Sequence, residues 1–558
     1  MKLVPPTALR FPSRFCVAQS VLSCVLAWLI AWAPSAYAVN PSAAKNAAKT
    51  AETEQLTGEL FYQILLGEMN LREGSASLGF SLLLDAARKT NDVELYSRSL
   101  DVALQNRSGD GALATAWAWT QAHPQDRRAN NQLLQILIVL GKVADTKEPL
   151  RKEIALAPEA DRQGIINVIP RQYARVTDKK LATQVVTQAL EPYVNQRDTA
   201  AAAWAAVGRM RLQSEDQAGA LKAAQLGIQA DAKSLPPALL TLELMSKGME
   251  AAEPLLQQSL SKQNSPDLAM SYVRVLIEQQ RYEIAESTLQ GITQKYPQYA
   301  DAWLVLGSMQ FERGQESVAE ESLNRYVGLA QKQPNANTAK GLLQAQSRRA
   351  EMLAKHGKLD EARQLIASLP SSNQEEQRNK LLSEAQLLRD HRQWQAAYDL
   401  LAKAQTEDDD VLYEQAMLAE KLNKLEQMEQ LLRRIIDKSP NYHNAYNALG
   451  FAFADRNIRL PEAKQLILKA LALSPDDPFI TDSLGWVEFR LGNLTAALLH
   501  LQKAYELRQD AEIAAHLGEV LWRLKRPDEA RRIWQEGLKL SPDNDTLKDT
   551  LQRLQPKL

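Results

Sequence analysis

The chain has 558 residues, of which 45% are hydrophobic and 24% are charged, and this length is well above the size at which one hydrophobic core stops growing. Several domains or an array of repeats are therefore expected. The formal net charge is −1, and no run of lysines and arginines forms the basic patch typical of nucleic-acid binding. We therefore expect no nucleic acid among the partners.

The beginning of the chain has the order of residues that directs a protein to export. Lys2, Arg10 and Arg14 precede the apolar run FCVAQSVLSCVLAWLIAWA, and small residues follow at Ala36 and Ala38. Positive charge, an apolar run and small residues at a cleavage site are typical of a secretory signal. The sequence therefore predicts a signal peptide over residues 1–38 and a protein located in the periplasm, either outer-membrane associated or without membrane contact.

Two alternatives to this cleavage remain. The apolar run is nearly long enough to stay in a bilayer as an anchor. Cys24 follows the small residue Ser23, which is the arrangement for lipidation, although the apolar residues after Cys24 argue against cleavage there. Cys16 and Cys24 both lie inside the predicted signal, so the mature chain is expected to have no disulfide and no cysteine metal ligand.

After the signal, residues 39–56 are small and polar, and this composition predicts a flexible leader. From Leu60 onward, apolar residues recur at spacings of three and four, which predicts helices throughout. We expect four helical segments: divergent N-terminal repeats over 57–200, middle repeats over 201–440, well-formed C-terminal repeats over 441–542 and a capping helix over 543–558. The fold class expected is all-α, a superhelical solenoid of helical hairpins.

The expectation of hairpins rests on a repeat period near 34 residues. Leu-Gly pairs place Gly450, Gly485 and Gly518 at spacings of 35 and 33 residues. An aromatic residue before the pair, small residues in the second helix and a proline after it complete the tetratricopeptide signature. At about 34 residues for each repeat, the chain holds roughly 14 hairpins, and residues 160–200 and 235–265 fit the pattern poorly.

The small residues have a physical role in this interpretation. Gly485 and Ala497 are expected where the two helices of one hairpin cross, because a larger side chain there pushes the helix axes beyond the usual ~8 to 10 Å. Ala504 is expected at the contact with the next hairpin. A stack of such hairpins buries apolar faces that a single hairpin leaves open.

The sequence offers no pattern of catalytic residues. None of the six histidines pairs with another at the spacing of a helical metal site, and His516 with Glu519 supplies two ligands, which do not make a site. Glycine-rich phosphate loops and nucleophile-elbow patterns are missing as well. We therefore expect no catalytic residue, no cofactor and no metal, and predict that the protein is not an enzyme.

A helical-hairpin array instead presents the first helices of its hairpins as a wall for binding other proteins. In the last three repeats, positions after the Leu-Gly pair carry aromatic residues beside charges, a combination that suits a bound protein segment. In the alternative interpretation, Trp486 and Trp522 fill gaps between hairpins. The predicted protein-binding groove consists of Phe451, Asp455, Asp482, Trp486, Phe489, Arg490, Glu519, Trp522 and Arg523.

The segment from Asn444 to Trp534 also resembles a known family. NALGFAFADR, SPDDPFITDSLGWVEFRLG and AEIAAHLGEVLWRL are similar to the C-terminal half of the exported tetratricopeptide adaptors of Gram-negative bacteria that partner a periplasmic carboxyl-terminal processing protease. The resemblance covers about the last 150 residues closely and the earlier part only in architecture. It implies an outer-membrane lipoprotein that brings the protease together with substrate proteins, including cell-wall hydrolases.

Two functions follow as expectations. The first is a periplasmic adaptor or scaffold that binds protein partners in its groove and presents substrates to a carboxyl-terminal processing protease. The alternative is a structural component of an envelope export or assembly machine, for polysaccharide or pilus, in which the repeats act as a spacer.

Overall fold

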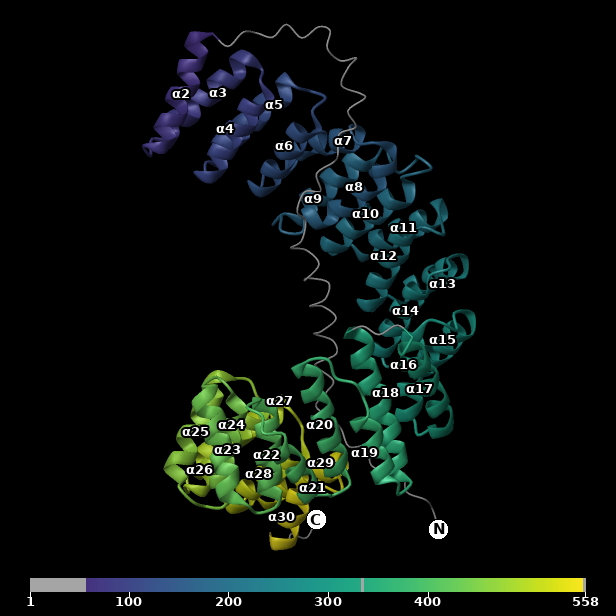
Figure 1. Cartoon of the computed structure of the whole chain (residues 1–558), viewed down its shortest axis with the longest axis vertical. Coiled ribbons are helices and arrows are strands. Elements are labelled where there is room, and N and C mark those ends of the chain that lie inside the picture. Colours follow the sequence, from purple (N-terminus) through teal and green to yellow (C-terminus); the bar gives the residue numbers. More distant parts are fainter. Residues whose placement is uncertain (1–56, 333–335, 555–558) are drawn as a thin grey trace. The chain divides into compact units, whose positions relative to one another are not determined.

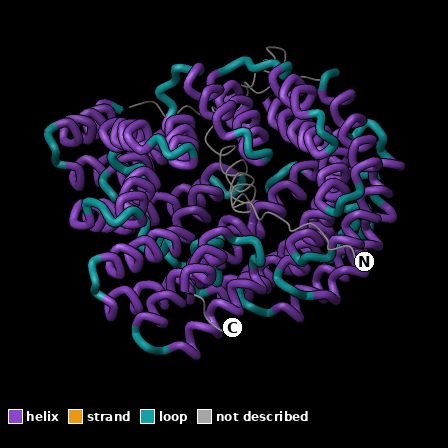
Figure 2. Tube along the Cα trace, turned by 90° about the horizontal axis from the view of Figure 1, so that it is seen from below, coloured by secondary structure: helices purple, strands orange, loops and turns teal. Residues whose placement is uncertain are grey.

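The computed structural model describes residues 57–332 and 336–554. These residues divide into two compact units between Met309 and Gln310, called here the N-terminal unit and the C-terminal unit. Helices and the loops that join them make up the whole of the described chain, with no strand in it (Figure 2). The all-α prediction is therefore confirmed for this part of the chain.

The N-terminal unit consists of helices that follow one another through short turns (Figure 1). Two short 3-10 helices, η3 (Val143–Thr146) and η4 (Glu250–Ala252), precede longer α-helices. The division between the units falls inside α16, the last helix of the following list. The α-helices are α2 (Gly58–Arg72), α3 (Ala76–Thr90), α4 (Val93–Gln105), α5 (Gly109–Ala122), α6 (Arg127–Val139), α7 (Lys147–Ala155), α8 (Glu159–Gln172), α9 (Lys179–Leu190), α10 (Ala200–Gln213), α11 (Gln217–Ala230), α12 (Leu235–Ser246), α13 (Glu253–Lys262), α14 (Pro266–Glu278), α15 (Tyr282–Lys295) and α16 (Ala300–Glu312).

The C-terminal unit also consists of helices joined by turns and loops. Its helices are α17 (Glu316–Ala330), α18 (Ala336–Lys355), α19 (Leu359–Ala367), α20 (Gln374–Asp390), α21 (Trp394–Lys403), α22 (Asp409–Lys421), α23 (Leu425–Lys438), α24 (His443–Asp455), α25 (Leu460–Leu473), α26 (Pro478–Arg490), α27 (Leu494–Leu507), α28 (Ala511–Arg523), α29 (Pro527–Leu540) and α30 (Asp545–Leu554).

The helices pair in sequence order, as the repeat period predicts. The 29 α-helices from α2 to α30 give fourteen successive pairs and one final helix. Most pairs pack as hairpins, for example α24 with α25, α26 with α27 and α28 with α29. The pair α8 and α9 departs from this pattern, because α8 packs chiefly on α10 while α9 packs on α7 and α10. This irregularity lies in residues 160–200, which match the repeat poorly.

The helix crossing predicted at Gly485 is confirmed. A Cβ atom at Gly485 lies 2.6 Å from Leu501 Cγ and 3.2 Å from the carbonyl oxygen of Ala497 when built on the backbone. Ala497, Leu501 and Ala504 are fully buried. Helices α26 and α27 therefore approach each other at a distance that only glycine permits at this position.

The turns between paired helices depend on a residue with left-handed backbone geometry. Gly492, between α26 and α27, has φ +86°, and Lys525 has φ +62° at the equivalent turn between α28 and α29. Glycine adopts this geometry without a steric penalty, whereas a lysine there costs about 1 to 2 kcal/mol. The sequence signal for this turn is therefore strong in one repeat and weak in the next.

Several sequence predictions lie outside the described residues. The signal peptide over 1–38, its alternatives at Cys24, and the leader over 39–56 belong to this part of the chain. The predicted boundaries of the repeat segments and of the capping helix stay predictions. Among the described residues, no helix has the length and the apolar composition that crossing a membrane requires.

Candidate protein-binding site

The predicted groove residues come from three first helices, α24, α26 and α28, which are neighbours in the C-terminal unit. The start of α26 is well defined, because the Asp477 carboxylate accepts hydrogen bonds from the backbone N–H groups of Phe479 and Ile480. Pro478 occupies the first turn, where its missing N–H costs nothing. Asp510 caps α28 in the same way through the N–H of Glu512.

The structure separates these nine residues by exposure. Asp482, Trp486 and Glu519 are buried, with only 5%, 3% and 2% of their surface exposed. The remaining six reach the surface at least in part: Asp455 and Arg523 are exposed, and Phe451, Phe489, Arg490 and Trp522 are half-buried. Direct contact with a partner is therefore restricted to these six, and their role in binding stays a prediction.

Trp486 lies at the centre of a stack of rings and charges. Its indole stacks on the His516 imidazole at a centroid distance of 4.2 Å and on the Phe489 ring at 5.0 Å. The Arg490 guanidinium lies 4.7 Å from the indole centroid. Trp486 thus packs between neighbouring hairpins and holds Phe489 and Arg490, which reach the surface, in place.

His516, which belongs to this stack, forms a buried ion pair with Asp482. The Nδ1 atom of His516 lies 2.9 and 3.0 Å from the two carboxylate oxygens of Asp482. Burial alone lowers the pKa of His516, but the charge and hydrogen bond of Asp482 raise it, and the resulting pKa is above the ordinary value. One turn before His516, burial raises the pKa of the Glu512 carboxyl.

Two further pairs connect successive first helices. Arg553 of α30 donates to both carboxylate oxygens of Glu519, at 2.6 and 2.5 Å. Arg490 Nη2 donates to the carbonyl oxygen of Asp455 at 2.9 Å and lies 3.5 Å from the Asp455 carboxylate. Planar two-point pairing of arginine with carboxylate is stronger than a single contact, so α30 is held firmly against α28.

A sequence signal for these pairs exists, although the sequence prediction did not use it. Asp482 and His516 are 34 residues apart, as are Glu519 and Arg553. One repeat period places equivalent positions of neighbouring first helices side by side. Opposite charges separated by one period therefore indicate contacts between hairpins, and they point to Asp482 and Glu519 as structural residues.

The surface formed by the six residues that are not buried combines aromatic rings with charges, a combination that suits the binding of a protein segment. Half-buried aromatic rings of Phe489 and Trp522 stand beside the exposed charges of Asp455 and Arg523. Aromatic and arginine side chains dominate the binding energy of protein interfaces. Within the described ranges, no three His, Cys, Asp or Glu side chains come together in a way that could hold a metal ion.

The comparison with protein families identifies the repeats. Family models described as tetratricopeptide repeat match residues 273–336, 483–545 and 410–442. Together with the helical hairpins, these matches define an all-α tetratricopeptide-repeat solenoid, and the chain is a tetratricopeptide-repeat protein. Proteins with this fold bind other proteins and are typically non-catalytic.

One curated relative matches a third of the chain. It is the TPR repeat-containing protein PA4667 of Pseudomonas aeruginosa, 44% identical over 181 residues, which are 32% of this chain and 30% of that protein. The match therefore spans less than two thirds of the relative's own length.

Three solved structures show some likeness to the chain. The thermophilic TPR protein TTC0263 of Thermus thermophilus is 22% identical, over 31% of this chain and 97% of that one, with a TM-score of 0.29. The Cut9–Hcn1 hetero-tetramer of APC/C gives 14% identity, 89% and 96% coverage and a TM-score of 0.32. MamA of Desulfovibrio magneticus gives 18% identity, 30% and 95% coverage and a TM-score of 0.25.

Proposed function

We propose that the protein is a periplasmic adaptor that holds a protein segment on the first helices of its C-terminal hairpins. The observation that carries this proposal is the row of surface-reaching side chains on α24, α26 and α28, namely Phe451, Asp455, Phe489, Arg490, Trp522 and Arg523. The aromatic rings of this row provide apolar contact, and its charges fix the position of the bound segment along the row. The rigid stack under Phe489 and Arg490 reduces the entropy that binding costs.

The finer part of the proposal concerns the partner. The resemblance of residues 444–534 to adaptors of a carboxyl-terminal processing protease supports the presentation of substrate proteins to such a protease. The predicted signal over residues 1–38 supports a periplasmic location, with association with the outer membrane as an extension of the proposal. The buried pairs Asp482–His516 and Glu519–Arg553 serve to hold the hairpins in register.

The proposed role can be tested by capture of partners from an envelope extract of the source organism, followed by mass spectrometry. We expect a carboxyl-terminal processing protease together with soluble cell-wall hydrolases. Export or assembly components recovered in fixed stoichiometry, without a protease, would instead support the alternative in which the repeats are a spacer within an envelope machine. N-terminal sequencing of the purified protein tests export, with a start at Val39 expected.

We predict that the double variant Trp522→Ala with Arg523→Ala loses affinity for the captured partner while it remains folded. Truncation of aromatic and arginine hot spots costs at least about 2 kcal/mol each, or roughly 30-fold in affinity. Trp522 is half-buried against Trp534, with ring centroids 5.7 Å apart, so its loss should cost less stability than the ~3 to 5 kcal/mol of a core tryptophan. Affinity and thermal melting are measured on the same sample.

The matched control is Trp394→Ala. Trp394 is also half-buried in the C-terminal unit but lies on α21, a second helix. We expect a comparable loss of stability and unchanged affinity. Equal affinity losses in the two variants, or a large loss of stability with unchanged affinity in the Trp522 variant, would contradict the placement of Trp522 in the binding surface.

A further inference from the structure

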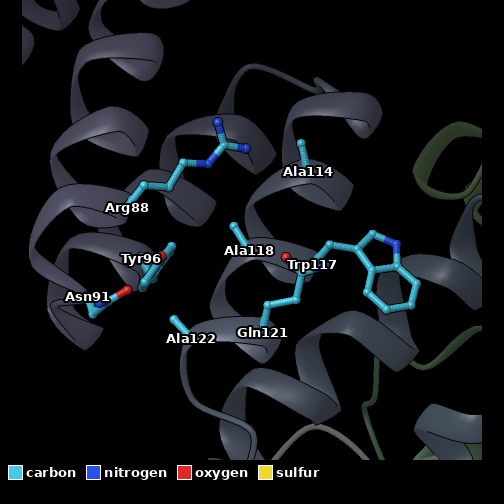
Figure 3. A pocket seen from close by; sticks show the side chains of 8 residues that line it. All are labelled: Arg88, Asn91, Tyr96, Ala114, Trp117, Ala118, Gln121 and Ala122. Carbon is cyan, nitrogen blue, oxygen red and sulfur yellow. The ribbon is translucent and has the colours of Figure 1, made fainter.

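The N-terminal unit contains two adjoining hollows on the side formed by second helices of its hairpins. The first hollow, of about 610 Å³, lies between the end of α3 and the surface of α5, where Arg88, Trp117 and Gln121 line it (Figure 3). The second, of about 490 Å³, extends from α5 to α7, where Lys152 is among its lining residues. Trp117 and Gln121 line both hollows, so the two hollows meet at these side chains and are described together as one groove.

We propose that this groove, called here the N-terminal groove, binds an extended acidic segment of a partner protein. This site is distinct from the function proposed above, because the N-terminal groove lies in the other unit and contains none of the residues of the C-terminal hairpins. The sequence predicts binding only on first helices, whereas this groove lies along the second helices α3, α5 and α7.

Trp117 gives the groove an exposed aromatic side chain that can anchor a ligand. The Trp117 side chain is 40% exposed, and its indole projects from α5 clear of the other labelled side chains (Figure 3). The first hollow has a preformed wall, because Tyr96, which lines it, is 2% exposed and stacks in parallel with Trp119 at a centroid distance of 6.4 Å. An exposed tryptophan is typical of the residues that dominate protein interfaces.

The side chains that line the groove carry more positive than negative charge. Three cations, Arg88, Arg151 and Lys152, line the groove with one carboxylate, Glu148. Arg151 is already engaged, since it donates to the Gln188 carbonyl at 2.8 Å and lies 3.5 Å from the Glu148 carboxylate and 3.7 Å from the Glu191 carboxylate. Within residues 57–332 and 336–554, no carboxylate lies at ion-pair distance from Arg88 or Lys152, whereas arginines elsewhere in this unit, such as Arg98, have one.

The nearest acid to Arg88 within its own helix is committed to another partner. Asp85 binds the Lys89 ammonium at 2.7 Å, which leaves the Arg88 guanidinium available at the mouth of the groove. Burial raises the pKa of Tyr96, which lines the groove, and the positive charge of Arg88 opposes part of this rise. The charge of Arg88 therefore acts on the interior of the groove. Carboxylates of a partner are the groups that complement this field.

The dimensions favour an extended chain as the occupant. The groove runs from α3 across α5 to α7, and an extended segment of about six residues, roughly 20 Å long, is the ligand length proposed for it. Arg88 on α3 and Lys152 on α7 lie at the two ends, with Trp117 on α5 between them. The expected ligand therefore has acidic side chains at both ends and a large apolar side chain in the middle, and the exposed Gln121 amide is available to its backbone.

Fluorescence polarisation with the full chain tests the proposal. The probe is a labelled six-residue peptide with two glutamates at each end and phenylalanine and leucine in the middle, compared with the same peptide carrying glutamines. We expect the acidic peptide to bind at least about tenfold more tightly at low salt, and the difference to shrink as salt is added. Equal binding of the two peptides, or no binding of the acidic one, would overturn the proposal.

Two variants locate the binding. The double charge reversal Arg88→Glu with Lys152→Glu is expected to abolish the preference for the acidic peptide, and Trp117→Ala should weaken binding by roughly 30-fold. The matched control reverses Lys233 and Lys262, which are exposed in the same unit outside the groove, and should change affinity less than about threefold. A control loss as large as that of the groove variants would reduce the effect to net charge and overturn the assignment.

Discussion

Asp482→Ala is expected to destabilise the C-terminal unit by about 3 to 5 kcal/mol, the usual cost of breaking a buried ion pair by removing one partner. His516, of which 2% is exposed, is left in the stack under Trp486 without its carboxylate. Deprotonation of His516 relieves part of this penalty, so the lower end of the range is expected above neutral pH. Urea unfolding of the wild type and the variant measures the difference.

The matched control removes the carboxylate partner of an exposed histidine in the same unit. His356 lies 3.0 Å from Glu316, and its side chain is 68% exposed. Glu316→Ala should therefore cost about 0 to 1 kcal/mol, as is usual for surface pairs. Equal losses from the two substitutions would show that burial of the Asp482–His516 pair contributes nothing.

The same pair gives a pH dependence of definite sign. The pKa of His516 is raised in the folded state, so the stability from the pair is fully present below the unfolded pKa of about 6.5 and is lost as pH rises through the folded pKa. The stability difference between wild type and Asp482→Ala should therefore narrow as the pH rises above about 6.5. Glu512 and Asp455 act on the pKa of His516, and Lys421 acts on that of Glu512. All three residues are present in both the wild type and the variant. A difference that widens with pH would contradict this assignment.

Gly485→Leu is expected to open the hairpin of α26 and α27. The new Cβ alone meets Leu501 Cγ at 2.6 Å and the Ala497 carbonyl at 3.2 Å, and the latter belongs to the backbone and cannot rotate away. Overpacking typically costs about 1 to 3 kcal/mol and occasionally more. Because a repeat hairpin contacts mainly its neighbours, hydrogen exchange should rise most in α24 to α29.

The control for this substitution is Gly328→Leu. Gly328 lies in α17 of the same unit, and a Cβ there meets nothing within 4 Å. The change should leave stability unchanged or raise it by up to about 1 kcal/mol, since leucine favours a helix over glycine. A uniform rise in exchange across the whole chain in the Gly485 variant would argue for one cooperative globule and against an array of hairpins.

The candidate site shows where sequence reasoning stops. The pattern after the Leu-Gly pair correctly places Trp486 and Glu519 on first helices, but it does not reveal that both are buried, with 3% and 2% of their surface exposed. Their coverage comes from His516 and Arg553, which lie about one repeat further along the chain. The N-terminal groove was missed for a related reason, because Arg88, Trp117 and Lys152 come from three different hairpins.

The sequence by itself determined the helical hairpins, their period and the crossing at Gly485, because each of these depends on residues within one repeat. Close helix packing requires a small side chain at a fixed position in each repeat, and glycine occupies this position at Gly450, Gly485 and Gly518. Only the tertiary structure decided which polar and aromatic side chains reach a partner. Exposure depends on how neighbouring hairpins cover one another, and that is settled by contacts about 34 residues apart that no local pattern contains.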